Sequence, residues 1–157
     1  MKTLLALLIC WQAQSADAPV KKMVIIGDSI TEGFGIKREL AYPQVLQQKI
    51  DKEKLRWRVI NSGISGSTSA SAVSRIAWHL KQKPDLIVLA LGGNDGLRGS
   101  DVKAMEQNLN KAVESAKQAG VKIILAGIKV PPNYGAGYSA SFEAVFPRVA
   151  RKNGIPL

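Results

Sequence analysis

The sequence has 157 residues, of which 46% are hydrophobic and 22% are charged, and its mean hydropathy is +0.00. This balance is typical of one soluble globular domain with a sizeable core and argues against a membrane-spanning or disordered chain. The net charge of +10 would suit a nucleic acid, but the lysines and arginines are scattered and form no basic block interleaved with aromatic residues, so we expect no nucleic-acid partner. A basic surface also attracts anionic substrates or lipid headgroups, and a lipid surface stays among the expected partners.

Residues 1–18 have the pattern of a secretory signal peptide. Lys2 supplies the charged start, residues 4–11 form an apolar run too short to span a bilayer, and small residues at 13–18 offer cleavage sites. Cys10 is the only cysteine, so the mature chain would have neither a disulfide nor a cysteine nucleophile. We expect a secreted or periplasmic protein; the alternative is an N-terminal segment that is buried or disordered.

Apolar runs of strand length alternate four times with segments of helical periodicity. We expect strands at 22–27, 56–60, 86–91 and 122–126, and helices at 42–54, 69–82, 101–119 and 139–152. Two of these helices have a clear apolar face. In the helix at 69–82 it is formed by Val73, Ile76, Ala77 and Leu80, and in the helix at 101–119 by Met105, Leu109, Ala112, Val113 and Ala116. The alternation with short connections predicts an α/β fold, a three-layer α/β/α sandwich with a parallel sheet in which the third strand, apolar on both faces, is central.

The last four residues, Gly154-Ile155-Pro156-Leu157, have the character of a strand that is beginning. We therefore expect one domain over residues 19–157 that is incomplete at the C-terminus, with the fifth strand and the last helix missing or incomplete. The alternative is a natural C-terminus in a loop.

Each of the first three strands is followed by a small, polar, glycine-containing turn: Gly27-Asp28-Ser29, Ser65-Gly66-Ser67 and Gly93-Asn94-Asp95. In a parallel sheet these turns lie at the same edge, which is where ligands bind in such folds. A serine hydroxyl there, with two or three hydrogen-bond donors, suits acyl transfer. We predict Ser29 as the nucleophile and the Ser29 N–H, the Gly66 N–H and the Asn94 amide as oxyanion donors. The alternative is that Asp28 and Ser29 only cap the next helix.

Other chemistries lack their patterns in this sequence. It has no phosphate-binding or dinucleotide-binding glycine motif, and Gly-x-Ser-x-Gly is broken because Thr31 stands at its last position. With one histidine and no cysteine cluster, a metal site is poorly supported and no cofactor is expected. Ser65 is a weaker alternative nucleophile, because no helix directly follows it.

Together the three turns resemble, in order and spacing, blocks I, II and III of the GDSL family of SGNH hydrolases. Residues 61–66, 91–99 and 132–135 resemble its secreted bacterial branch of thioesterases, lysophospholipases and arylesterases. The resemblance implies a flavodoxin-like hydrolase of small-molecule esters or thioesters, expected to be monomeric. It also implies that Ser29, Gly66 and Asn94 are catalytic and that Asp28 and Asp95 organise the turns. Arg98 and Tyr134 would either border the acyl pocket or be solvated loop residues.

One block of that family is absent from the sequence. A serine hydroxyl needs a base, and the family supplies it from an Asp-x-x-His segment after the fifth strand, which occurs nowhere in the 157 residues. The single histidine, His79, is expected on the helix surface near the opposite edge of the sheet from Ser29. We therefore expect a truncated, inactive copy of a serine esterase or thioesterase; the alternative is a non-catalytic relative that binds an acyl or acetyl ligand.

Overall fold

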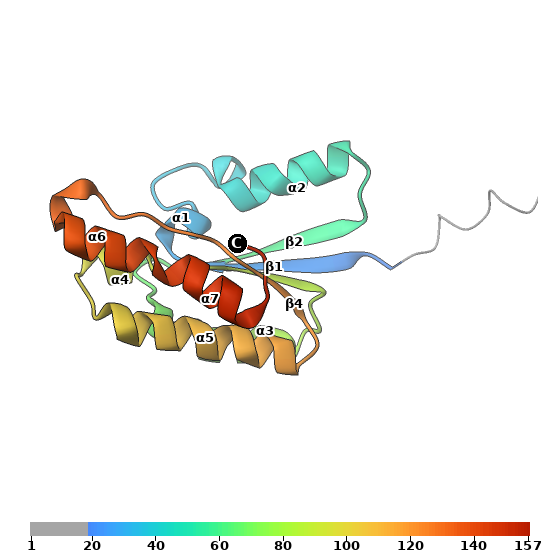
Figure 1. Cartoon of the computed structure of the whole chain (residues 1–157). Helices are drawn as coiled ribbons and strands as arrows, with labels where there is room; N and C mark the ends of the chain where they lie inside the picture. The colour runs from blue at the N-terminus through green and yellow to red at the C-terminus, as the bar shows by residue number, and fades with distance from the viewer. Residues whose placement is uncertain (1–18) are drawn as a thin grey trace, which may run out of the picture.

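The computed structural model describes residues 19–157, so the predicted signal peptide and Cys10 lie outside the described residues. Four parallel strands form one sheet in the order β2-β1-β3-β4 (Figure 1). Their bounds are β1 (Lys21–Gly27), β2 (Trp57–Gly63), β3 (Leu86–Ala90) and β4 (Lys122–Leu125). The predicted α/β architecture is confirmed, and the third strand lies inside the sheet between β1 and β4.

Helices cover both faces of this sheet. Figure 1 shows α2 on one face and α3, α5 and α7 on the other, while α1, α4 and α6 lie near the carboxyl ends of the strands. The helices are α1 (Ser29–Glu32), α2 (Tyr42–Lys52), α3 (Ala72–Leu80), α4 (Gly93–Leu97), α5 (Val102–Gln118), α6 (Ala136–Glu143) and α7 (Val145–Asn153), with 3-10 turns η1 (Arg38–Leu40), η2 (Ser69–Ser71) and η3 (Pro132–Tyr134). No helix within residues 19–157 is long and apolar enough to cross a membrane.

The main core fills the space between the sheet and α3, α5 and α7. Alternate strand residues point into it, including Val24 and Ile26 of β1 and Ile87 and Leu89 of β3. The five apolar residues predicted for α5 are all buried there, which confirms the predicted face of that helix: Met105, Leu109, Ala112, Val113 and Ala116. The opposite face of the sheet is less covered, because Ile25 is buried whereas Val88, its partner in the sheet register, is only half-buried.

β2 extends to Gly63, three residues beyond the predicted end at Ile60. Its outward N–H groups have side-chain partners, since Gln47 Oε1 accepts from Val59 N–H at 2.6 Å and Asn61 Oδ1 accepts from Gly63 N–H at 2.8 Å. These bonds satisfy the unpaired groups of an edge strand. Residues that look like a turn in the sequence therefore continue the strand.

The predicted inner face of α3 is partly wrong. Val73 and Ala77 are exposed, and the buried residues of the helix are Ala72, Ile76 and His79. The helix is rotated relative to the prediction because two of its polar residues, Arg75 and His79, also face the sheet, where they form hydrogen bonds with the ends of β1 and β2. An apolar pattern alone does not indicate such a face.

The C-terminal part also differs from prediction. The expected helix over 139–152 is two helices, α6 and α7, separated at Ala144. Pro147 explains the break, because it has no N–H to continue the hydrogen bonds of α6. After α7, Leu125 N–H donates to Pro156 O at 3.1 Å, so the chain returns beside β4 on the side away from β3.

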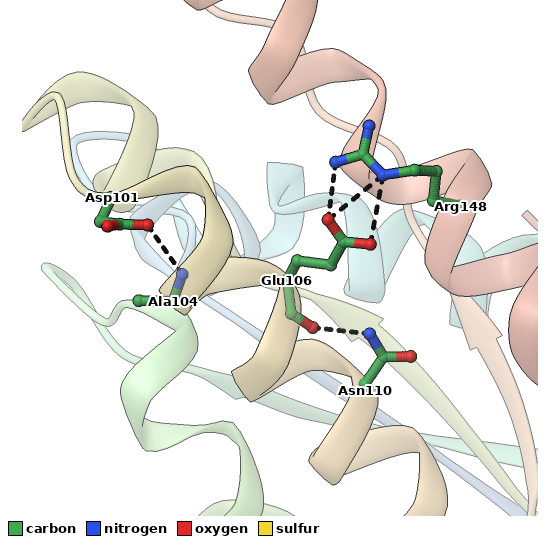
Figure 2. A network of polar contacts seen from close by, with 5 residues as sticks. All are labelled: Asp101, Ala104, Glu106, Asn110 and Arg148. Atoms are coloured by element: carbon green, nitrogen blue, oxygen red, sulfur yellow. Dashed lines mark hydrogen bonds and ion pairs between the residues drawn. The ribbon is translucent and has the colours of Figure 1, made fainter.

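Polar side chains join α5 to α7 at the surface of the core. Arg148 binds the Glu106 carboxylate through two nitrogens, with the shortest contact, Nη2 to Oε2, at 2.6 Å (Figure 2). Asn110 donates to Glu106 O and accepts from Asn153 Nδ2, both at 2.8–2.9 Å. Asp101 caps α5 by accepting from Ala104 N–H at 2.9 Å, and its side chain lies away from the ion pair (Figure 2).

The Glu106–Arg148 pair gives a testable pH dependence. Hydrogen bonding to Arg148 lowers the pKa of Glu106 below its ordinary value of 4.5. A lowered carboxyl pKa stabilises the fold above pH 4.5, and this contribution is lost as the pH falls through the pKa of the folded state. We expect Glu106→Gln to reduce the free energy of unfolding at pH 7 by about 0.2–1 kcal/mol, as for exposed ion pairs, and the difference from wild type to vanish at low pH.

Urea unfolding between pH 3 and 7 measures this effect. Glu114→Gln, on an exposed position of the same helix, is the matched control. A difference between Glu106→Gln and wild type that stayed constant across this range would contradict the assigned role of the pair.

Candidate active site

The sheet register aligns the ends of the first three strands. Gly27 of β1 stands opposite Gly63 of β2 and Ala90 of β3, so the three turns leave the sheet from one edge. The first two turns are joined directly, because Ile64 N–H donates to Gly27 O at 3.1 Å. The predicted common origin of the three turns is therefore present in the structure.

The second turn is also fixed to α1. Glu32 Oε2 accepts hydrogen bonds from the Ser65 N–H, at 2.7 Å, and from the Ser65 hydroxyl. A carboxylate thus holds the hydroxyl of the weaker alternative nucleophile. Through these two bonds Ser65 stabilises the conformation of the turn.

Asn94 of α4 and Arg98, which directly follows α4, connect the third turn to the second. Asn94 Nδ2 donates to Ser67 O at 2.9 Å, and Arg98 Nη2 donates to Gly66 O at 3.2 Å. Gly66 has a φ of +75°, a conformation that favours glycine. Both bonds use the carbonyls of the second turn, which leaves the N–H of Gly66 available.

The first and third turns lie in close contact. A Cβ atom placed on Gly93 would lie 2.9 Å from Asp28 Oδ2, so only a residue without a side chain allows this approach. Asp28 is buried, and its Oδ1 accepts from Ile30 N–H at 3.0 Å. Asp28 therefore caps α1, as the alternative interpretation expected, and Ser29 becomes the first residue of that helix.

Ser29 is half-buried and its hydroxyl is unengaged. Within residues 19–157, neither its hydroxyl nor its backbone N–H forms a hydrogen bond, and the Gly66 N–H forms none either. Asn94 uses one amide hydrogen for Ser67 and retains a second. This edge of the sheet thus presents one hydroxyl together with three available N–H donors, groups of the kinds that acyl-transfer sites use as nucleophile and oxyanion donors.

Asp95 has a different position from Asp28. It is buried, and its two oxygens accept from the Ser69 N–H at 2.8 Å and the Ser69 hydroxyl at 2.6 Å. Asn108 Nδ2 also donates to the Ser69 hydroxyl at 3.1 Å. This network ties α4 to η2 and α5, so that the carboxylate supports the turns that carry Gly66 and Asn94.

Sequence reasoning missed a polar cluster beneath this edge. Arg75 Nη1 donates to Gly27 O at 2.8 Å, and Arg75 Nη2 donates to Ser62 O and, at 3.2 Å, to the Ser62 hydroxyl. Arg75 thereby joins the ends of β1 and β2 through their carbonyls. An arginine one residue before a core isoleucine of an amphipathic helix was the available signal for this role.

His79 belongs to the same cluster, and its predicted position is wrong. The side chain is only 4% exposed, and Nε2 lies 2.8 Å from the Ser62 hydroxyl. Ser62 pairs with Ile26, so His79 lies beneath the carboxyl half of the sheet and not at the opposite edge. Burial and the charge of Arg75 lower the pKa of His79, which keeps its imidazole neutral at pH 7. Its bond to Ser62 directs Nε2 to β2 and away from α1.

A cavity of about 390 Å³ adjoins Ser29. It is lined by both neighbours of Ser29 and by the ends of β3 and β4: Asp28, Ile30, Thr31, Tyr42, Ala90, Gly93, Ala126, Gly127, Ile128 and Lys129. Its size is within the usual range of small-molecule sites. Arg98 and Tyr134 do not line it, because Arg98 bonds Gly66 O and the Tyr134 hydroxyl donates to Leu97 O at 2.9 Å. Among the described residues, no group of three or more His, Cys, Asp or Glu could hold a metal ion.

The Asp95 network can be tested through stability. In Asp95→Asn, an amide NH₂ would face one of the two Ser69 donors, and a buried donor would be left without a partner. We expect the free energy of unfolding to fall by about 1–3 kcal/mol. Asp101→Asn is the matched control, because Asn is an equally good cap at an exposed helix start. Equal unfolding midpoints in urea for the two variants would contradict this role of Asp95.

The chain is similar to known proteins over most of its length. The model of the GDSL-like Lipase/Acylhydrolase family matches residues 25–157. The Esterase TesA of Pseudomonas aeruginosa is 38% identical over 141 residues, which span 89% of this chain and 70% of that protein. Thioesterase 1/protease 1/lysophospholipase L1 of Escherichia coli strain K12 is 35% identical over 155 residues, 98% of this chain and 71% of that protein.

Solved structures give the same result. The crystal structure of AlinE4, an SGNH-hydrolase family esterase, superimposes with a TM-score of 0.85 at 33% identity and covers 90% of this chain and 77% of that one. The similarity thus includes the three turns and the sheet that carries them. The chain belongs to the GDSL-like lipase/acylhydrolase family, and its fold is that of the SGNH hydrolases.

Proposed function

We propose that Ser29 is the nucleophile of a serine hydrolase that acts on small-molecule carboxylic esters or thioesters. One observation carries the proposal: the unengaged Ser29 hydroxyl lies at the same sheet edge as three available N–H donors, those of Ser29, Gly66 and Asn94. The family to which the chain belongs supports a hydrolase, and the names of its relatives indicate esters and thioesters.

The proposed reaction has two steps. The Ser29 oxygen attacks the acyl carbon and loses its proton to a base, and the carbonyl oxygen becomes an oxyanion held by the N–H groups of Ser29, Gly66 and Asn94. Collapse of this intermediate breaks the bond to the alcohol or thiol, which leaves with a proton, and an acyl-serine remains. Water then attacks the acyl carbon and releases the carboxylic acid and the Ser29 hydroxyl.

The base for the first step is not His79. It is the only histidine among the 157 residues, and its Nε2 is hydrogen-bonded to the Ser62 hydroxyl. Asp28 and Asp95 use their carboxylates to hold backbone and side-chain donors of the turns. We therefore propose that this chain by itself hydrolyses its substrate slowly. Its nucleophile and oxyanion donors would act without an imidazole base.

The cavity beside Ser29 is proposed to hold the acyl chain. Ile30, Ala126 and Ile128 give it an apolar lining, and it begins at the residues that flank the nucleophile. Thr31 and Tyr42, whose hydroxyls lie 2.9 Å apart, bond to each other within this lining. This bond engages one of the two hydroxyl hydrogens, so it reduces the polarity of the lining without removing it.

The export and domain proposals rest on the sequence. We propose that residues 1–18 direct the chain out of the cytoplasm as a signal peptide and that residues 19–157 carry the hydrolase site. The fractionation of the full-length protein in its host tests the export proposal.

Covalent labelling tests the nucleophile. We expect a fluorophosphonate to label Ser29 of the full chain slowly and not to label Ser29→Ala, with the modified peptide identified by mass spectrometry. Added imidazole should accelerate labelling of the wild type in proportion to its concentration, because it supplies the missing base. Ser65→Ala and Ser62→Ala are controls that should retain the label. A label on Ser62 or Ser65, or no label with imidazole present, would contradict the proposal and favour an acyl-binding protein.

Acyl-chain preference tests the cavity. Ala126→Leu should fill part of it, so phosphonylation by a long-chain alkyl fluorophosphonate should slow by about tenfold relative to an ethyl one, the effect expected from excluding one or two methylenes. Ala77→Leu, on the exposed face of α3, is the matched control. If Ala126→Leu slowed phosphonylation by the two reagents equally, the acyl chain would bind outside this cavity.

A further inference from the structure

The turns around Ser29 carry an unusual number of exposed apolar side chains. Among residues 19–157, twelve large hydrophobic side chains are exposed, and six of them lie in the segments that follow β1, β2 and β3. We call these six the apolar rim: Ile30, Phe34, Ile36, Leu40, Ile64 and Leu97. Such a concentration on one side of a molecule marks an interaction surface.

The segment from α1 to α2 forms the prominent part of the rim. Phe34 is 75% exposed and stands between Gly33 and Gly35, which have φ values of +83° and +79°. A Cβ atom on Gly35 would meet no atom within 4 Å, so the tip of this turn projects into open space. Figure 1 shows the segment at the end of the sheet where α1 lies.

The rest of the rim lies on neighbouring turns. Ile64 follows β2 and is held beside α1 by its N–H bond to Gly27 O. Leu97 ends α4, next to Arg98, which bonds the second turn at Gly66. The exposed apolar side chains thus come from the segments that follow β1, β2 and β3, which also carry the proposed active site.

Basic residues accompany the rim. Lys37 and Arg38 lie between Ile36 and Leu40 and are exposed, and the exposed Arg98 and Lys129 lie at the adjoining turns. Two carboxylates, Glu32 and Glu39, are also present, and Glu32 is engaged by Ser65. Among the exposed side chains of these segments the four cations exceed the two carboxylates, because Asp28 and Asp95 of the same turns are buried.

We propose that the apolar rim docks onto an anionic lipid bilayer and brings the Ser29 site to the membrane surface. Apolar side chains at the tip of a loop enter the boundary of headgroups and acyl chains, while neighbouring lysines and arginines bind anionic headgroups. The same net charge disfavours a second copy of the chain as the occupant, because like charges repel. This proposal rests on the proposed function. Docking through the apolar rim would place the acyl cavity next to the lipid, from which an acyl substrate would enter.

Sedimentation with vesicles of ether-linked phosphatidylglycerol tests docking without any turnover. All variants carry Ser29→Ala in the full chain, so residues 1–18 are common to every sample and the result does not depend on the proposed nucleophile. We expect Phe34→Asp and Ile36→Asp each to lower the partition coefficient by about tenfold or more, as for the loss of one buried large apolar side chain. Leu55→Asp is the matched control, because Leu55 is 56% exposed, against 53% for Ile36, but lies on the turn before β2 at the other edge of the sheet.

The charge requirement has its own comparison. Lys37→Gln/Arg38→Gln should weaken binding to anionic vesicles more than Lys49→Gln/Lys52→Gln, which removes two exposed charges from the far end of α2. Phosphatidylcholine vesicles should bind the unaltered rim less than phosphatidylglycerol vesicles. Equal binding by the Phe34, Ile36 and Leu55 variants would overturn the proposal. Concentration-dependent dimerisation that Phe34→Asp abolishes, without vesicle binding, would also overturn it in favour of a self-association surface.

Discussion

The carbonyl oxygen of Gly27 is the junction on which the candidate site depends. It ends β1 and accepts hydrogen bonds from Ile64 N–H at 3.1 Å and from Arg75 Nη1 at 2.8 Å. The first bond fixes the turn after β2. The second ties the end of β1 to α3, and Arg75 also binds Ser62 O of β2. Ser29 follows two residues later. The position of its hydroxyl relative to Gly66 therefore depends on the register of β1 and β2 and on the bond between their turns.

The acidic residues of the site stabilise its geometry. Asp28 holds the first turn of α1, Glu32 holds the turn after β2, and Asp95 holds Ser69. Each carboxylate compensates N–H or O–H groups that the sharp turns would otherwise leave without partners. The donors that remain are those at Ser29, Gly66 and Asn94. The carboxylates of these turns are therefore engaged within the protein.

Much of this arrangement follows from sequence pattern, because apolar runs of strand length and helical periodicity report burial directly. The parallel sheet, the apolar face of α5 and the common edge of the three turns are of this kind. The errors arose where hydrogen bonds replace apolar contacts. His79 Nε2 is hydrogen-bonded to the Ser62 hydroxyl between α3 and β2, while His79 Nδ1 is buried without a partner among residues 19–157, and α3 is rotated accordingly. Asn61 completes the edge of a strand that looks like a turn. The break between α6 and α7 could have been predicted from Pro147, whose missing N–H interrupts a helix.

The central claim is that one oxyanion site is formed by Ser29, Gly66 and Asn94. A crystal structure of the protein phosphonylated at Ser29 tests it most directly, because a phosphonate reproduces the tetrahedral shape and negative oxygen of the acyl-transfer intermediate. We expect this oxygen to lie within about 2.7–3.1 Å of Ser29 N, Gly66 N and Asn94 Nδ2, with the alkyl group in the cavity beside Ala126. An oxygen that points to solvent, or that is bound by Arg75 and His79 instead, would contradict it.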